Sequence, residues 1–155
     1  MQTLDHPNVI KLILAARCPD RLLICTPYCP KGSLSSVLTS LTPAHLAVYV
    51  SQLTSAVCYL HQKRVVHSDI KPSNVFIDDR ENAILGDFGV AFMVPTDQTT
   101  VRPKVVGGTP AFMAPELFGP GHVDPFKLDV YSLGAVIWCI LFRLEPNSEN
   151  VYDYL

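Results

Sequence analysis

HSDIKPSN at residues 67–74 and DFG at residues 87–89 are the stretches that decide the fold to be expected of this chain. Between them lie two short apolar runs, residues 75–77 and 83–85, separated by turn-forming residues 78–82. Such runs are typical of a β-hairpin, which brings the loops at its two open ends together. The sequence therefore predicts two carboxylates, a lysine and a carboxamide close in space.

The residue types in these two loops suit phosphate chemistry. Asp87 and Asn74 offer the hard oxygen ligands that Mg²⁺ prefers. Asp69 can accept the proton of a hydroxyl group, and Lys71 can neutralise charge on a transferring phosphate. Phosphoryl transfer depends on positioning and charge neutralisation more than on covalent work by the protein. The set therefore predicts Mg²⁺-dependent phosphate transfer.

Upstream of these loops, the sequence predicts one long helix from about residue 43 to residue 62. Thr42 can cap free N–H groups, and a proline such as Pro43 is tolerated at the first helical position. Apolar residues then recur at helical spacing and predict one buried face, formed by Leu46, Val50, Leu53, Val57 and Leu60.

Nearer the N-terminus, two apolar runs predict another β-hairpin. Residues 9–16 and 21–28 are separated by residues 17–20, which contain the turn formers proline and aspartate. A break at residues 29–33 follows, and the apolar residues between 34 and 41 predict a short helix.

The C-terminal part divides into a loop and an apolar helix. Residues 93–125 are rich in proline, glycine and threonine and predict a long irregular loop of the kind that often carries function. The apolar stretch 128–142 contains Asp129 and is shorter than the roughly 18 to 20 residues needed to cross a bilayer. We therefore expect a core helix and no membrane span.

Composition narrows the functional classes. The 155 residues include 12 basic and 14 acidic side chains, and no basic cluster suggests a nucleic-acid partner. The five cysteines lack the paired spacing of a zinc site, which favours reduced thiols. Residues 1–7 lack the pattern of a signal peptide. We expect an intracellular, cytoplasmic protein, and the oligomeric state stays open.

The order of these motifs resembles the signature set of eukaryotic-type protein kinase domains. It runs from His67, Asp69 and Asn74 through the DFG stretch to Ala114-Pro115-Glu116, so that the resemblance covers essentially the whole chain. It implies an α+β, partial protein-kinase-like fold, with a small-lobe β-strand remnant and a mostly α-helical large lobe. The limits implied are a partial kinase domain over 1–155, comprising the end of the small lobe (1–28), the hinge (29–33) and the large lobe through the central buried helix (34–155).

The resemblance also implies roles for single residues. Asp69 corresponds to the catalytic base and Lys71 to the phosphate-contacting lysine, while Asn74 and Asp87 correspond to the Mg²⁺ ligands. Thr109 is expected to bridge Asp69 and Lys71. The lysine two residues after Asp69, together with Thr109, resembles the serine/threonine branch of the family and not the tyrosine branch.

Adenine contacts follow from the same resemblance. Thr26 corresponds to the gatekeeper, the Pro27 carbonyl and the Cys29 N–H are expected to face adenine, and Phe76 is expected to form the apolar floor below it. A stack that ties the lobes together is expected from Leu12, Phe88, His67 and Asp129, and the Asp129 carboxylate is expected to bind the 67–74 loop by hydrogen bonds, since an unpaired buried charge is costly.

One position departs from the pattern. Ser68 stands where many of these kinases carry an arginine that binds a phosphate of the activation loop, and serine cannot form that bidentate ion pair. Residues 104–106, where that phosphosite usually lies, contain no hydroxyl group. The hypothesis is that switching of the domain between its inactive and active states does not depend on this phosphate.

The family's glycine-rich loop, ATP-binding lysine and paired glutamate are not found in residues 1–155, so the domain is expected to be incomplete at both ends. Two functions are therefore weighed. The first is a serine/threonine protein kinase that uses ATP and Mg²⁺ and acts on a protein substrate. The alternative is a non-catalytic interaction module, similar to a pseudokinase, or an inactive fragment.

Overall fold

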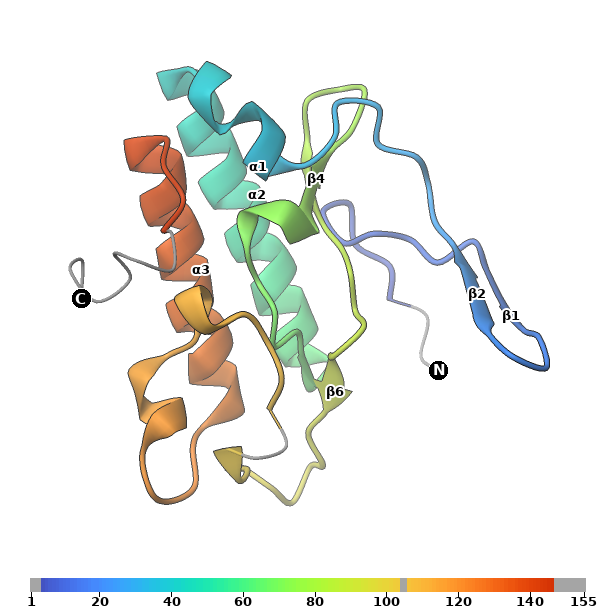
Figure 1. Cartoon of the computed structure of the whole chain (residues 1–155), viewed down its shortest axis with the longest axis vertical. Helices are drawn as coiled ribbons and strands as arrows, with labels where there is room; N and C mark the ends of the chain where they lie inside the picture. The colour runs from blue at the N-terminus through green and yellow to red at the C-terminus, as the bar shows by residue number, and fades with distance from the viewer. Residues whose placement is uncertain (1–3, 104–105, 147–155) are drawn as a thin grey trace.

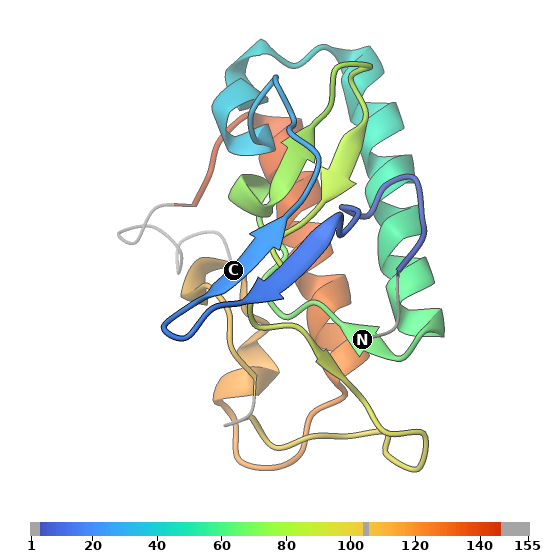
Figure 2. The ribbon, with the colours of Figure 1, turned by 90° about the vertical axis from the view of Figure 1, so that its right-hand side faces the viewer.

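The computed structural model describes residues 4–103 and 106–146, and these form an α+β fold. Figures 1 and 2 show helices α2 and α3 side by side, with a small hairpin across them and a second hairpin standing apart near the N-terminus. The principal elements are β1 (Leu14–Arg17), β2 (Leu22–Cys25), α1 (Leu34–Val37), α2 (Pro43–Gln62), β3 (Val65–Val66), β4 (Val75–Ile77), β5 (Ala83–Leu85), β6 (Phe92–Met93) and α3 (Pro125–Phe142).

Helix α2 has the bounds that the sequence predicts. It starts behind Thr42, whose backbone N–H donates to Nδ1 of His45 at 3.0 Å, and Pro43 occupies the first turn. Leu53, Val57 and Leu60 are buried as expected, but Leu46 and Val50 are only half-buried. The buried face is completed by Tyr49 and Ala56. It therefore overlaps the predicted face but is rotated about the helix axis toward Tyr49 and Ala56.

The hairpin β4–β5 also has the predicted bounds. Its strands pair antiparallel, with Val75 opposite Leu85 and Ile77 opposite Ala83. These four side chains are buried, since opposite residues point to the same face of a two-stranded sheet. Helix α2 packs against β5, so that the hairpin is fixed to the helical core.

The first hairpin is shorter than predicted. Only residues 14–17 and 22–25 pair with one another, whereas the apolar run was expected to start at residue 9. The start of that run bonds instead to β5: the Ile10 N–H donates to the Leu85 carbonyl at 2.8 Å, and the Leu85 N–H donates to the Asn8 carbonyl at 2.9 Å. A buried Val9, 5% exposed, gains more from this core position than from the exposed hairpin.

Helix α3 begins three residues before the predicted stretch, since Asp124 caps it by accepting the Phe126 N–H at 3.0 Å. With 18 residues it is longer than the predicted stretch 128–142, and it is long and apolar enough to cross a membrane by length and composition alone. Its packing is that of a core helix, because it lies against α2 and buries Pro125, Leu128, Asp129, Ser132, Leu133, Val136, Cys139 and Ile140.

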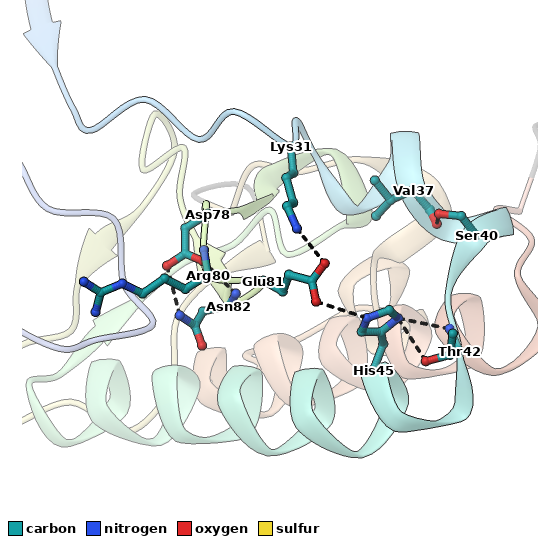
Figure 3. A network of polar contacts seen from close by, with 9 residues as sticks. All are labelled: Lys31, Val37, Ser40, Thr42, His45, Asp78, Arg80, Glu81 and Asn82. Carbon is teal, nitrogen blue, oxygen red and sulfur yellow. Dashed lines mark hydrogen bonds and ion pairs between the residues drawn. The ribbon is translucent and has the colours of Figure 1, made fainter.

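A surface network joins three segments around the β4–β5 turn (Figure 3). Glu81 accepts from the Lys31 ammonium at 2.5 Å, and its other oxygen lies 3.7 Å from Nε2 of His45 at the start of α2. Asp78 closes the turn itself by accepting the backbone N–H groups of Arg80 and Asn82. The acidic residues of this turn therefore serve the turn and its ion pairs.

Two valines of α3 test which face of the helix holds the core. We expect Val136→Ala, at a site with 0% exposure, to lower the free energy of unfolding by about 2 kcal/mol, from the two methyl groups lost and the cavity left. Val130→Ala, at 56% exposure, is the matched control, because the same change in helix propensity occurs on the same helix. Equal losses in chemical denaturation would contradict this packing.

Candidate active site

One buried carboxylate of helix α3 binds the start of the 67–74 loop. Asp129 of α3 is 1% exposed, and its two oxygens accept the backbone N–H groups of His67 and Ser68, each at 2.9 Å. Nε2 of His61 lies 3.0 Å from one of these oxygens. The expected link between Asp129 and the loop is therefore present, and it supplies partners for a charge that would otherwise be costly to bury.

His67 joins the 67–74 loop to the segment after β5. Its Nε2–H donates to the Gly86 carbonyl at 2.9 Å, while Nδ1 accepts the Asp69 N–H at 3.3 Å. Burial lowers the pKa of His67 more than the hydrogen bond to Gly86 raises it, so that the imidazole is neutral at neutral pH. Both ring nitrogens are occupied within the loop structure, which makes His67 a structural residue.

The expected stack between the lobes is present only in part. The rings of His67 and Phe88 meet edge to face with centroids 4.8 Å apart. Leu12, however, is 41% exposed and is not a buried member of the stack. It lies in the stretch just before β1, whose hairpin stands away from the core in Figure 1.

Asp69, Thr109 and Lys71 form a closed polar triangle. The Thr109 hydroxyl donates to Oδ1 of Asp69 at 2.7 Å, and the Lys71 ammonium donates to the Thr109 oxygen at 2.7 Å. The third side is the ion pair between Lys71 and Oδ2 of Asp69 at 2.9 Å. Side chains from two distant segments thus meet around one carboxylate.

The environment keeps Asp69 ionised. Partial burial raises the pKa of its carboxyl group, but hydrogen bonds from Lys71, Thr109 and Asn74 and the charge of Lys71 outweigh it and hold the pKa below its ordinary value. A carboxylate has about four acceptor positions, and these three donors leave it able to accept one more hydrogen bond. Asp69 can therefore orient an approaching hydroxyl group.

Asn74 is oriented so that an oxygen is left for a cation. Its Nδ2 donates both to the Asp69 carbonyl at 2.8 Å and to Oδ2 of Asp69 at 2.9 Å, which uses both amide hydrogens and leaves Oδ1 as an acceptor. The Gly86 N–H donates to the Asn74 carbonyl at 2.9 Å. Asn74 and the residue after Gly86, Asp87, therefore stand at the same end of the β4–β5 hairpin.

Asp87 presents an exposed carboxylate at that end. Its backbone is left-handed, with φ of 59°, and one carboxylate oxygen accepts the Gly89 N–H at 3.2 Å. Together with Oδ1 of Asn74 it gives an oxygen donor set that fits Mg²⁺, which commonly takes one or two protein ligands besides water and phosphate. Within residues 4–103 and 106–146, no group of three histidine, cysteine or acidic side chains forms a metal site of another kind.

Thr109 reaches Asp69 because Gly108 precedes it. Gly108 has φ of 134°, and a Cβ atom there would lie 2.4 Å from the Ser68 carbonyl oxygen, so the chain can approach this closely only as glycine. Sequence reasoning identified Thr109 but missed the role of Gly108. The signal that could have found it is the glycine pair at 107–108 next to the threonine.

Ser68 is buried beside the site without a partner for its hydroxyl group. The residue is 8% exposed and left-handed, with φ of 65°, and its Oγ has no hydrogen bond among the described residues. Of the residues 104–106 discussed with it, 104 and 105 lie outside the described part of the chain.

The residues predicted to contact adenine form no hydrogen bond with this triangle among those described. Thr26 and Pro27 are exposed in the stretch between β2 and α1, and Cys29 beyond them is half-buried, with a thiol pKa that burial raises. Pro27 and Cys29 line a cavity of about 380 Å³ together with parts of residues 4–11 and the β4–β5 turn. Phe76 is half-buried on β4, against Gly86.

Comparisons of this sequence with a family model and with known proteins all point to protein kinases. Residues 1–153 match the model of the protein kinase domain family. A serine/threonine-protein kinase of Schizosaccharomyces pombe is 37% identical over 100% of this chain and 46% of its own length. A probable cell cycle serine/threonine-protein kinase of Encephalitozoon cuniculi is 34% identical over 98% of this chain and 34% of its own length. The chain thus spans a third to a half of these relatives.

Two aspartates, one within α3 and one at its N-cap, test the hydrogen bonds between Asp129 and the 67–74 loop. Asp129→Asn leaves one acceptor oxygen for two buried N–H groups, so we expect the free energy of unfolding to fall by about 1–3 kcal/mol. Asp124→Asn is the matched control on the same helix, because asparagine caps a helix about as well as aspartate and the change should stay within about 0.5 kcal/mol. Chemical denaturation measures both, and a tolerated Asp129→Asn would count against these hydrogen bonds.

Proposed function

Because this chain belongs to the protein kinase domain family, we propose that it transfers the γ-phosphate of ATP to serine and threonine hydroxyl groups of a protein substrate. The observation that carries the proposal is the triangle of Asp69, Thr109 and Lys71. It places an ionised carboxylate and an ammonium group within one hydrogen-bond network. Relatives named as serine/threonine kinases support the same branch.

In the proposed reaction, the carboxylate of Asp69 accepts a hydrogen bond from the substrate hydroxyl and orients its oxygen toward the γ-phosphorus. A bond forms between that oxygen and phosphorus as the bond from phosphorus to the ADP oxygen breaks, and the hydroxyl proton passes to Asp69. Because the pKa of Asp69 is held low, its main contribution is to orient the hydroxyl, with proton transfer following late.

Lys71 and Thr109 position the reacting groups. The Lys71 ammonium, only 24% exposed at its side chain and fixed by Thr109 and Asp69, is proposed to contact the transferring phosphate and stabilise its charge. The Thr109 hydroxyl bonds to both Lys71 and Asp69 and so fixes their relative positions. Since Thr109 belongs to the segment after β6, the triangle forms only when that segment is in place.

Asn74 and Asp87 are proposed to hold Mg²⁺, which when bound neutralises charge on the phosphates of ATP. The support is the acceptor left on Asn74 and the exposed carboxylate of Asp87 at the same end of the hairpin. Adenine contacts are proposed from Thr26, Pro27, Cys29 and Phe76. In this assignment residues 1–28 end the small lobe, 29–33 form the hinge and 34–155 belong to the large lobe.

The assigned base is tested by substitution in the protein. We expect Asp69→Asn to lower the rate of phosphate transfer to a protein substrate by about 10²–10⁴-fold, because the neutral amide neither orients nor accepts the proton as the carboxylate does. The affinity for Mg-ATP should change little. Asp20→Asn, in the exposed turn between β1 and β2, is the control. Full activity of the Asp69 variant would favour the non-catalytic alternative.

Cation binding has a separate test. We expect Asp87→Asn to weaken Mg-ATP binding at least about 10-fold in calorimetry, roughly 1.4 kcal/mol, because a charged oxygen ligand is lost. Binding of ATP with Mg²⁺ removed should be the same in both proteins. An equal Mg²⁺ dependence in both proteins would reject Asp87 as a ligand.

A further inference from the structure

Three backbone carbonyls converge on the guanidinium group of Arg64. Residues 94–98, here called the 94–98 turn, follow β6 directly. Nε of Arg64 donates to the Val94 carbonyl at 3.3 Å, and Nη2 donates to the Pro95 carbonyl at 2.6 Å and to the Gln98 carbonyl. The side chain therefore binds the first and last parts of the turn at once.

The main chain of Arg64 takes part as well. The Val94 N–H donates to the Arg64 carbonyl at 2.8 Å, and the Gln98 N–H donates to the Pro95 carbonyl at 3.1 Å, so that the turn is closed on itself and fixed to Arg64. Arg64 has a left-handed backbone, with φ of 61°, and directly follows Lys63, the C-cap of helix α2. A left-handed residue other than glycine is costly, and these bonds hold it in place.

The guanidinium group also lies over an aromatic ring of α3. Its carbon atom is 5.0 Å from the centroid of the Phe126 ring, in the first turn of that helix. Arg64 thus connects the end of α2, the start of α3 and the 94–98 turn. The two helices belong to the core, so the turn is attached to a rigid frame.

The position of Arg64 along the chain relates it to the candidate active site. Strand β3, residues 65–66, follows Arg64 and leads directly into His67, and it pairs with β6. The 94–98 turn begins the segment that later delivers Gly108 and Thr109 to Asp69. Fixing the turn therefore fixes the β6 end of the path to the triangle, whose other end is held by the hydrogen bond from Thr109 to Asp69.

We propose that Arg64 is a positioning residue that orders the 94–98 turn by donating to backbone carbonyls of that turn, so that no phosphate on Thr99 or Thr100 is required for the order. Its three bonds use Nε and both hydrogens of Nη2, and the acceptors are neutral. Ser68, buried next to Asp69, offers no cationic group to bind a phosphate. Only the kinetic part of the proposal rests on the proposed function.

Hydrogen exchange in the intact, phosphatase-treated protein tests the ordering directly. We expect the Val94 and Gln98 amides to be protected in the wild type and to exchange at least about 10-fold faster in Arg64→Ala. Arg64→Lys keeps the charge and most of the stem but lacks the planar fork, so it should exchange at an intermediate rate. Arg80→Ala, which changes an arginine of the β4–β5 turn, should match the wild type.

Exchange elsewhere separates positioning from general stability. The core amides of α2 and α3 should keep their wild-type rates in Arg64→Lys, since a general loss of stability would raise them together with those of the turn. Phosphate transfer by Arg64→Ala should have a lower kcat and an unchanged Kd for Mg-ATP. The double variant Thr99→Ala/Thr100→Ala should keep both the protection and the rate.

Three results would overturn the proposal. They are wild-type exchange of the 94–98 turn in Arg64→Ala, loss of protection after phosphatase treatment of the wild type, and loss of protection in the double threonine variant. If the wild type transfers no phosphate, the proposed function fails, while the exchange rates still decide whether Arg64 orders the turn.

Discussion

The carboxylate of Asp129 accepts the two consecutive N–H groups of His67 and Ser68, and the rest of the site depends on this contact. It fixes the start of the 67–74 loop to helix α3. From there His67 reaches Gly86, Asp69 reaches Thr109, and Asn74 meets the end of β5. A charge that is expensive to bury is retained because it satisfies two backbone donors that would otherwise have no partner.

Part of the backbone strain lies around the same place. Of the five non-glycine residues with positive φ in the described part of the chain, Arg64, Ser68 and Asp87 lie in or next to the segments of the site, while Glu81 and Arg143 lie elsewhere. Each left-handed residue costs about 1–2 kcal/mol, which hydrogen bonds to Val94, Asp129 and Gly89 help to offset. Strained residues concentrate where side chains have to be aimed with precision, and these three flank the triangle on both sides.

Patterns within a few residues predicted the local elements well, whereas the long-range contacts of Asp129 and Thr109 were predicted only through the family resemblance. Helix α2 and the hairpin β4–β5 have the predicted bounds, because capping, periodicity and turn residues act within a few positions. The run from residue 9 was assigned to one strand, but its start bonds to β5. The hairpin pattern predicted that Asp69, Lys71 and Asn74 lie close together, and the addition of Thr109 came from the family resemblance. Arg64 had no signal, since its partners are carbonyls, which every residue carries.

The separation of 62 residues between His67 and Asp129 sets an order of events during translation. At about 5–20 residues per second, the ribosome adds Asp129 roughly 3–12 seconds after His67. Until then α2 and the β4–β5 hairpin can form from local contacts, but the loop between them has no acceptor for its buried N–H groups. The nascent chain therefore carries an unassembled site for seconds, and chaperones have that interval in which to bind it.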